Sequence, residues 1–481
     1  MHEASSGIGA LFAALVAWTL CGASVAEAET IALTGNIVPV AGDAIEGGTI
    51  LIVDGKITAV GKDVELPFDA KVVEFEGKTL FPGMVLAHTS GGLDVANENL
   101  PVTPFVDVYD SIDPSSLFFE SALRQGLTTI GIFQGRNTVV GGMGRAIRPV
   151  GLMVEEMTVA ASTGLALSTT PKSGYDAMVQ AAQMREAFAE LDDYIGKLAE
   201  KKYDEKLEKD GEKIDVMPEE ARERGEKLIE YEDLDDKHRT LYRLTKGEVD
   251  AHVHCVRAMD VLKAIAIAEE RGFLARTTFV LGPEAHKAAD RIKETGRPVV
   301  LSPTLTHREY HPITGEESTT FVPAVFADKG IPFALSVNPG NAFGLGSLPY
   351  QAARLVAHGI DRETAVAAIT TRPAEILGLA SRVGDLAPGR DGNVLVLSGD
   401  PLALDTNVEE VWINGRKAYD MSEDSRMKRL LEGAKPDMGT ASADEGGSEA
   451  DGDSDADADS TSDQGAEAGA AKDESKPEKK D

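Results

Sequence analysis

Apolar strand-like runs alternate with helical runs through the middle of this chain, and this alternation constrains the fold more than any other feature. Strands separated by helices pair in parallel, and eight such units close into a (β/α)8 barrel of the TIM type. We therefore predict an α/β barrel over residues 81–384, with functional groups at the C-terminal ends of its strands. The candidate strands are 84–87, 127–133, 164–167, 251–254, 277–281, 298–301 and 332–336.

Two further kinds of sequence surround or interrupt this pattern. Residues 30–80 and 385–420 consist of short strand-like runs with tight turns, such as the Asp54-Gly55 turn between two apolar runs. Residues 186–248 are rich in charge at helical spacing. We interpret this stretch as a helical insertion whose charges form a solvated face.

Charge is concentrated at the C-terminal end of the chain. The formal net charge is -32 over 481 residues, and residues 437–481 hold 15 Asp and Glu against 4 Lys, with almost no large apolar side chains. Such a segment cannot bury enough surface to offset its ordering entropy, so we expect a disordered acidic tail. The composition also argues against a nucleic-acid partner, because phosphate binding needs clustered Lys and Arg.

The N-terminus has the pattern of a signal peptide. Residues 8–25 are apolar or small, and Ala26-Glu27-Ala28 fits a cleavage site of the small-x-small type. We predict a signal peptide over residues 1–28, a periplasmic or secreted mature protein and no membrane association after cleavage. An uncleaved anchor is the competing interpretation, but the apolar run is shorter than the ~20 residues that a spanning helix prefers. Cleavage would leave Cys255 as the single cysteine, which excludes an internal disulfide.

A short motif at the start of the predicted barrel points to a known family. Residues 81–90 contain Pro-Gly, an apolar run and then His88-Thr89-Ser90, where side chains two apart share one face of a strand. This stretch resembles the amidohydrolase superfamily, in particular its imidazolonepropionase-like branch, which has His-x-His at this place. Further segments that resemble the family, in the same order, are 138–144, 253–260, 282–287, 368–379 and 383–392.

The resemblance implies both an architecture and a chemistry. Members combine the barrel with a small β-sandwich built from both chain ends, which here would be residues 30–80 and 385–420. They bind one or two divalent ions such as zinc at the strand ends, where the metal activates water and an Asp after the eighth strand moves protons. Their class hydrolyses carbon–nitrogen bonds other than peptide bonds.

Several ligand positions that the resemblance implies are changed in this chain. His88 and His254 stand at two of the histidine positions, whereas Ser90 and Leu281 replace two others. Asn338 stands where the family has the Asp, and an amide cannot act as a general base. We expect these five residues to converge at the C-terminal mouth of the barrel, with His88 and His254 as a residual metal-binding pair.

Two more histidines could in principle rebuild the pocket. His307 and His311 follow the seventh predicted strand, in a loop that would overhang the barrel mouth. The simpler interpretation, which we favour, is an ordinary polar loop. No catalytic residue is assigned from the sequence.

The sequence therefore supports two main functional hypotheses and a weaker third, which is a metal-independent or mononuclear hydrolase that uses His307 or His311. The first is an exported amidohydrolase-related hydrolase of carbon–nitrogen bonds whose binuclear metal site is largely lost, with activity reduced or absent. The alternative is an inactive relative that binds a small-molecule ligand or pairs with an active homologous amidohydrolase subunit.

Overall fold

The computed structural model describes residues 29–40, 42–211, 216–338 and 347–432. The predicted signal peptide (1–28) and acidic tail (437–481) lie outside these residues, so both stay predictions. Residues up to Lys428 belong to one unit, and only the last four described residues belong to a second. No helix in the described ranges is both long enough and apolar enough to cross a membrane.

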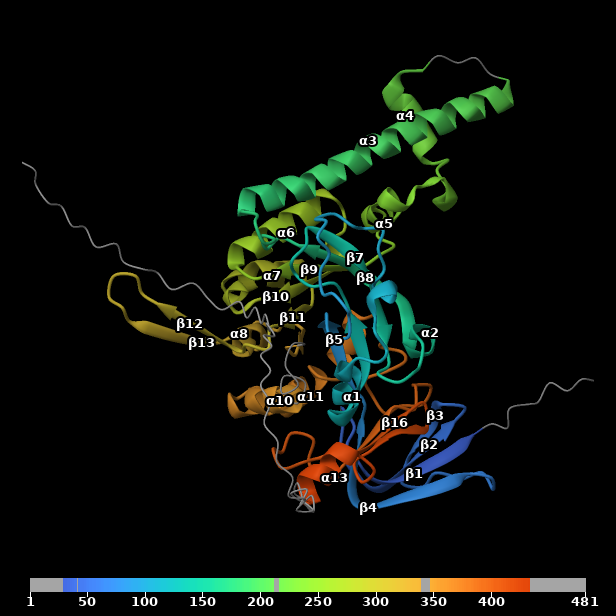
Figure 1. The fold of residues 1–481 in the computed structure, drawn as a ribbon, viewed down its shortest axis with the longest axis vertical. Coiled ribbons are helices and arrows are strands. Elements are labelled where there is room, and N and C mark those ends of the chain that lie inside the picture. Colours follow the sequence, from blue (N-terminus) through green and yellow to red (C-terminus); the bar gives the residue numbers. More distant parts are fainter. Residues whose placement is uncertain (1–28, 41, 212–215, 339–346, 433–481) are drawn as a thin grey trace, which may run out of the picture. The chain divides into compact units, whose positions relative to one another are not determined.

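The central sheet has eight strands and forms a nearly closed barrel (Figure 1). All of its strands run in one direction except β7, which is antiparallel to both neighbours. The fold class predicted from the sequence is confirmed, because all seven candidate strand runs coincide with strands of this sheet. In order across the sheet these strands are β14 (Phe333–Leu335), β11 (Val299–Leu301), β10 (Thr277–Leu281), β9 (Ala251–Cys255), β8 (Thr158–Ser168), β7 (Val140–Ile147), β6 (Leu127–Ile132) and β5 (Met84–Thr89).

The direction of β7 follows from the length of its connection. Only residues 133–139 separate β6 from β7. A parallel neighbour would need a crossover of about a dozen residues or more, so this short link forces the chain to turn back.

The two edges of the barrel sheet are joined by a backbone bridge. The amide of Val85 in β5 donates to the carbonyl of Ile369 at 3.0 Å, and the amide of Leu335 in β14 donates to the carbonyl of Ala368 at 3.0 Å. Two consecutive residues thereby hold both edge strands, which leaves neither edge open to pairing with another chain.

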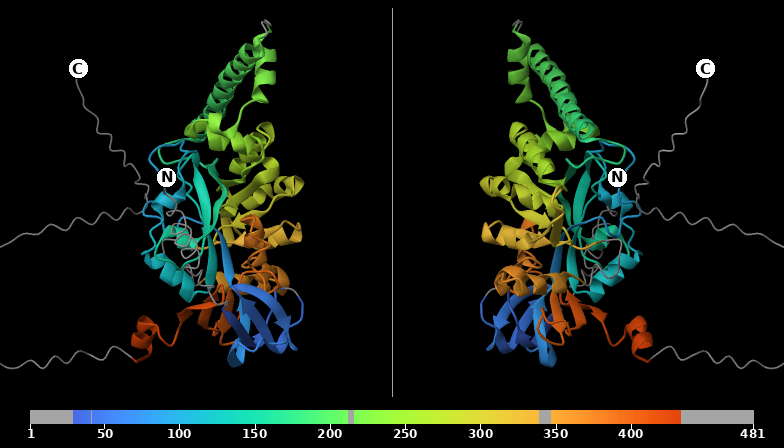
Figure 2. Two further views of the ribbon diagram at one scale, coloured as in Figure 1. Left: turned by 90° about the vertical axis from the view of Figure 1, so that its right-hand side faces the viewer. Right: turned by 90° about the vertical axis from the view of Figure 1, so that its left-hand side faces the viewer.

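Helices cover the outer face of the barrel sheet and pack on it through one large apolar cluster that includes Phe188, Ile265, Ile292 and Phe326. The insertion predicted at residues 186–248 lies within helical structure between β8 and β9, and its longest helix projects beyond the sheet (Figure 2). The α-helices are α1 (Leu117–Arg124), α2 (Val154–Met157), α3 (Ala177–Asp210), α4 (Pro218–Glu226), α5 (Asp236–Thr245), α6 (Ala258–Glu270), α7 (Ala289–Thr295), α8 (Val322–Asp328), α10 (Ser347–Ala357), α11 (Arg362–Ala367), α12 (Thr371–Ile376) and α13 (Ser425–Glu432), and the 3-10 helices are η1 (Val108–Ser111), η2 (Tyr231–Asp233), η3 (Leu274–Arg276) and η4 (Pro283–Ala288).

The two chain ends pair in a second sheet, as expected, and its seven strands form one continuous sheet. Its central contact joins distant segments, because Leu80 of one strand pairs with Val396 of another. Leu33, Ile50 and Trp412 belong to an apolar core that is separate from that of the barrel. The strands in order are β17 (Arg416–Asp420), β16 (Val408–Ile413), β15 (Val394–Leu397), β4 (Lys71–Pro82), β1 (Thr30–Ile37), β2 (Ile45–Val53) and β3 (Lys56–Gly61).

Candidate functional site

Four aromatic rings fill the inside of the barrel near the C-terminal ends of β5, β6 and β9. His88 lies at the end of β5, Phe133 directly follows β6, and His252 and His254 lie two apart on one face of β9. The His88 ring is stacked on Phe133 with centroids 4.8 Å apart and meets His254 edge-on at 4.7 Å. Phe133 also lies 4.1 Å from the ring of His252. We call these four residues the ring cluster.

Two glycines make room for the ring cluster. A Cβ atom on Gly144 in β7 would lie 2.3 Å from the ring of Phe133, and one on Gly164 in β8 would lie 2.7 Å from the ring of His252. Gly164 also has a φ of +143°, which L side chains rarely adopt. Glycine at both places therefore lets the barrel wall approach the rings.

Burial keeps the three imidazoles of the ring cluster neutral. The pKa of His88 lies well below its usual range because the ring is buried and because His254 and His252 are close. Burial, together with the proximity of His254, lowers the pKa of His252 to about 3. The pKa of His254 is lowered to about 4 by burial and by the charge of Arg136. Neutral imidazole is the form that binds metals, but it adds no negative charge to offset that of a cation.

The donor set does not fit the two-metal site that the family implies. Nε2 of His88, Nε2 of His254 and both ring nitrogens of His252 are buried and have no hydrogen bond of ordinary geometry in the described part of the chain. Zinc accepts imidazole ligands, yet no three His, Cys, Asp or Glu side chains in the described ranges are grouped closely enough to hold one ion. No carboxylate among the described residues hydrogen-bonds to these rings.

The structure places Leu281 differently from the expectation. Its neighbour Val280 pairs in register with His254 and packs with Val300 and Ala334 inside the barrel. Side chains alternate along a strand, so Leu281 points to the opposite face, where it belongs to the apolar layer under the helices. Val280 therefore occupies the inward position at the level of His254.

Ser90 and Asn338 follow the ends of β5 and β14, which point to the same edge of the barrel. Ser90 is half-buried, and Asn338 is exposed. Both residues therefore lie at the C-terminal mouth, whereas neither supplies the imidazole or carboxylate of the family.

His307 and His311 lie apart from the ring cluster. His307 is on β12 (Thr306–Tyr310), which pairs with β13 (Glu317–Phe321) in a separate hairpin that extends away from the barrel sheet (Figure 1). Its ring is 5.2 Å from that of His286, which lies in η4. His311 is exposed at the hairpin turn and accepts a hydrogen bond from the amide of Thr314 at 3.2 Å. This arrangement resembles the ordinary polar loop more than a rebuilt site.

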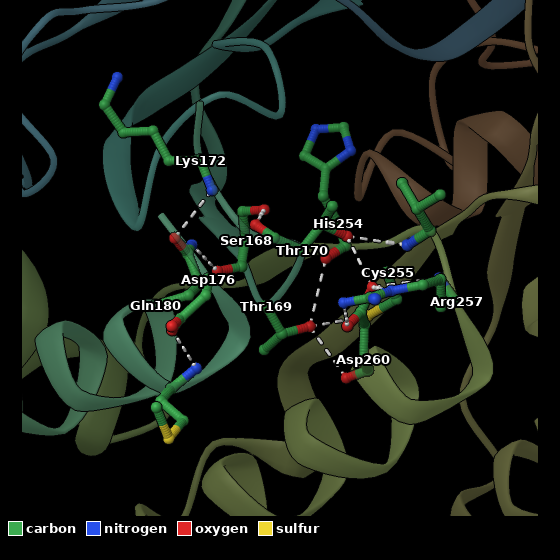
Figure 3. Close-up of polar contacts among 12 residues, drawn as sticks. Ser168, Thr169, Thr170, Lys172, Asp176, Gln180, His254, Cys255, Arg257 and Asp260 are labelled. Atoms are coloured by element: carbon green, nitrogen blue, oxygen red, sulfur yellow. Dashed lines mark hydrogen bonds and ion pairs between the residues drawn. The ribbon is translucent and has the colours of Figure 1, made fainter. Parts of the chain in front are cut away.

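A polar network supports the strand ends beside the ring cluster (Figure 3). The hydroxyl of Thr169 donates to the carbonyl of Asp260 at 2.9 Å, and the hydroxyl of Thr170 donates to the Asp260 carboxylate at 3.2 Å. Arg257 pairs with the same fully buried carboxylate at 3.2 Å. In Figure 3 the His254 ring points away from this network. The network therefore holds β8, β9 and α6 together, and the His254 ring lies on the other face, against His88.

A cavity of 540 Å³ opens at the same end of the barrel. The loop after β5 forms most of its wall, and Gln134, which follows Phe133 of the ring cluster, forms another part. The oxygen of Gln134 accepts the amide of Gly142 at 2.8 Å, which fixes the orientation of the side chain. The wall combines carboxylates, including Asp94 and Asp107, with apolar groups such as Phe105.

Four residues of this region were not predicted as site residues from the sequence, namely Phe133, Gln134, Gly144 and Gly164. Phe133 and Gln134 end the apolar run of the second barrel strand, and residues at such ends face the mouth of a barrel. Their position at the end of this strand could therefore have identified both as residues of the barrel mouth. The two glycines carry a signal only once the adjacent rings are known.

A nearly closed barrel with a site at the C-terminal ends of its strands is the arrangement found in barrel enzymes and their relatives. The sequence pattern of a family described as an amidohydrolase family matches residues 351–419 of this chain. The amidohydrolase tasK of Hapsidospora irregularis is 25% identical over 413 residues, which are 78% of this chain but only 39% of the length of that protein. A solved amidohydrolase from Thermotoga maritima MSB8 is 29% identical, with a TM-score of 0.67, and the match covers 81% of this chain and 100% of that one.

The family match and these two relatives support an assignment to the amidohydrolase superfamily. The likeness of this chain to the imidazolonepropionase-like branch stays a prediction.

Proposed function

We propose that this protein keeps the amidohydrolase barrel but has lost two-metal hydrolysis, and that it binds a small molecule at the C-terminal mouth. The observation that carries this proposal is the ring cluster, in which Phe133 packs against His88 and His252. An aromatic hydrocarbon ring cannot ligate an ion or accept a proton, and here it contacts two of the three imidazoles.

The missing proton acceptor is the second support for the proposal. Hydrolysis by an activated water needs a group that takes the proton of that water, which in the family is the Asp after the eighth strand. Asn338 stands there in this chain and is neutral. The depressed pKa values of His252 and His254 make these rings weak bases as well.

The cavity beside Gln134 supports the binding part of the proposal. Its volume of 540 Å³ falls within the range of small-molecule pockets, roughly 300–1,000 Å³. Its wall mixes apolar and charged side chains, as such pockets do. A ligand there would lie at the end of the barrel where relatives carry out their chemistry.

A metal-dependent hydrolase of carbon–nitrogen bonds is the second candidate. The four buried imidazole nitrogens of the ring cluster favour it, because imidazole nitrogen is a preferred donor for zinc. A rotation of these rings about their side-chain bonds would be needed to direct three nitrogens at one ion.

Metal content separates the two candidates. The purified chain is dialysed against metal-free buffer after incubation with zinc, and bound metal is measured by elemental analysis for wild type and His88→Ala. Our proposal predicts substoichiometric zinc that does not depend on His88. One tightly held zinc per wild-type chain, lost in His88→Ala, would overturn the proposal and favour the hydrolase.

We also propose that the protein is exported to the periplasm or beyond. The support is the apolar run of residues 8–25 and the Ala26-Glu27-Ala28 site in the sequence. Mass spectrometry of the mature protein after expression in a bacterial host should give a chain that begins at Glu29. A full-length chain that retains Met1 would contradict export by cleavage.

A further inference from the structure

A second cavity lies between the barrel and the sheet of the chain ends. Its volume is 820 Å³, and it is independent of the barrel mouth. The turns of two hairpins, at Gly55 and Gly415, form one side of the cavity. The connection after β7, from Arg148 to Gly151, forms the other side.

Arg148 is the feature of this cavity that points to a ligand. Its guanidinium is half-buried in the cavity wall, yet among the described residues no group forms a hydrogen bond or an ion pair with it, and its Nε is fully buried. Burial lowers the pKa of Arg148, although arginine stays charged at neutral pH. A partly desolvated cation without a partner is costly, so a ligand that supplied the missing acceptors would be bound favourably.

The carboxylate whose charge acts on Arg148 is that of Asp391, which two other cations already use. One oxygen of the buried Asp391 accepts Lys56 Nζ at 2.5 Å, and the other accepts Arg382 at 2.9 Å. Arg148 is close enough to interact with the charge of this carboxylate but does not pair with it. Three cations therefore surround one carboxylate, which leaves an excess of positive charge beside the cavity.

The other charged groups of the wall do not neutralise Arg148. Glu29 pairs with Arg416 at 3.3 Å, and Glu156 accepts the amide of Leu152 at 2.9 Å. Lys417 pairs with residues of its own sheet. Asp54 and Glu156 are exposed carboxylates of the cavity wall that keep their charge, and both oppose anion binding beside them. The attractive position is therefore local to Arg148.

We propose that this cavity binds a small oxyanion, a carboxylate or a phosphate group, through the guanidinium of Arg148. The planar fork of arginine can donate two parallel hydrogen bonds to either group. The cavity is large enough for the organic part of a small acid or a phosphorylated metabolite as well.

The test is a calorimetric titration of the full chain with inorganic phosphate and, separately, with succinate, at constant ionic strength set by sodium chloride. We expect saturable binding of at least one probe, and the preferred probe identifies the ligand chemistry. Arg148→Gln should weaken that binding by roughly ten- to a hundredfold, because charge-assisted hydrogen bonds are lost. Saturable binding of neither probe to the wild type would overturn the proposal.

Arg291→Gln is the matched control. It removes the same charge from a surface pair with Glu294 on α7, far along the chain from the cavity wall, and should bind the probe as the wild type does. Equal affinity of Arg148→Gln and wild type would contradict the proposal. If Arg148→Gln does not fold, Arg148→Lys keeps the charge but loses the fork, and unchanged affinity in that variant would contradict the proposal equally.

Discussion

A buried polar atom without a partner costs about 1–3 kcal/mol, and the ring cluster contains four such imidazole nitrogens among the described residues. Favourable ring contacts, each worth about 0.5–1.5 kcal/mol beyond the area buried, offset part of this cost. The contacts join His88 to Phe133 and to His254, and Phe133 to His252. At the scale of single residues, then, the barrel mouth is held by packing of neutral rings.

The low pKa values of these rings predict acid sensitivity. Unfolded imidazole titrates near 6.5, whereas folded His252 and His254 titrate at about 3 and about 4. The unfolded state therefore binds protons first as the pH falls. The contribution of these neutral rings to the free energy of unfolding should be fully present above about pH 6.5. It should decrease from there toward about pH 4, by roughly 1.4 kcal/mol per pH unit for each ring.

Urea unfolding at about pH 7.5, 6.5 and 5.5 measures this effect, since most carboxylates stay ionised in that range. His252→Gln should show a shallower dependence on pH than wild type, whatever its absolute stability. His311→Gln, at an exposed turn, should keep the wild-type slope. Equal slopes for wild type and His252→Gln would show that the buried ring does not act in this way.

The position of Leu281 shows where residue-level inference from the sequence stops. A short matching segment identifies the strand, but a shift of one residue moves a side chain to the other face. Only the pairing of Val280 with His254 settles which of the two faces inward. His252, by contrast, can be placed on the same face as His254 from spacing alone, because side chains two apart on a strand share a face.

The zinc uptake gained by restoring metal ligands should therefore depend on which face of β10 carries the new histidine. Ser90→His, Val280→His and Asn338→Asp together should increase zinc uptake over wild type, since the new imidazole would face the ring cluster. Replacing Leu281 by His in the same background, with Val280 kept, would place an imidazole in the apolar layer and should lower stability by about 1–3 kcal/mol without zinc uptake. Elemental analysis and thermal unfolding of both triple variants test this expectation. Greater zinc uptake by the variant at Leu281 would show that Leu281, and not Val280, faces the ring cluster.

At the scale of elements, local composition determined which barrel strands could be predicted from the sequence. The seven parallel strands are apolar and rich in branched residues, so they could be recognised. The strand β7 contains Gly141, Gly142 and Gly144 and lacks that signal. It is a strand because its neighbours supply hydrogen bonds on both sides, which is tertiary information.

One buried amide adds hydrogen bonds to the apolar packing that attaches α3 to the barrel. Gln180 donates to the carbonyls of Thr138 at 2.8 Å and Ser168 at 2.7 Å, and it accepts the amide of Lys172 at 3.0 Å. Gln180→Leu would leave these backbone groups without partners and should lower the free energy of unfolding by about 2–4 kcal/mol.

Gln183→Leu is the control on the same helix, because Gln183 bonds to Glu186 at the surface, at 2.8 Å. It should change the free energy by less than about 0.5 kcal/mol. Chemical unfolding of both variants provides the comparison. Similar losses in the two would mean that helix propensity, and not the amide bridge, determines the attachment.

At the scale of the whole molecule, the acidic C-terminal segment is predicted to be dispensable for folding. Deleting residues 437–481 should change the melting temperature by less than about 1 °C, because the segment has too little apolar surface to pack. Truncation after Asp420 is the contrasting variant. It removes Asp424, whose buried carboxylate pairs with Arg124 at 2.6 Å, and should lower the melting temperature measurably. A fall of several degrees on removal of residues 437–481 alone would show that the segment packs on the protein.

The sheet made from both chain ends has a consequence for biogenesis. Lys56 and Asp391, which form an ion pair in the folded protein, are 335 residues apart in the chain. A ribosome adds roughly 5–20 residues per second, so β4 waits on the order of tens of seconds for β15. During that interval one edge of β4 has no strand to pair with and can join another nascent chain. A factor that covers exposed strand edges should therefore raise the yield of this protein most if it acts before Val394 is synthesised.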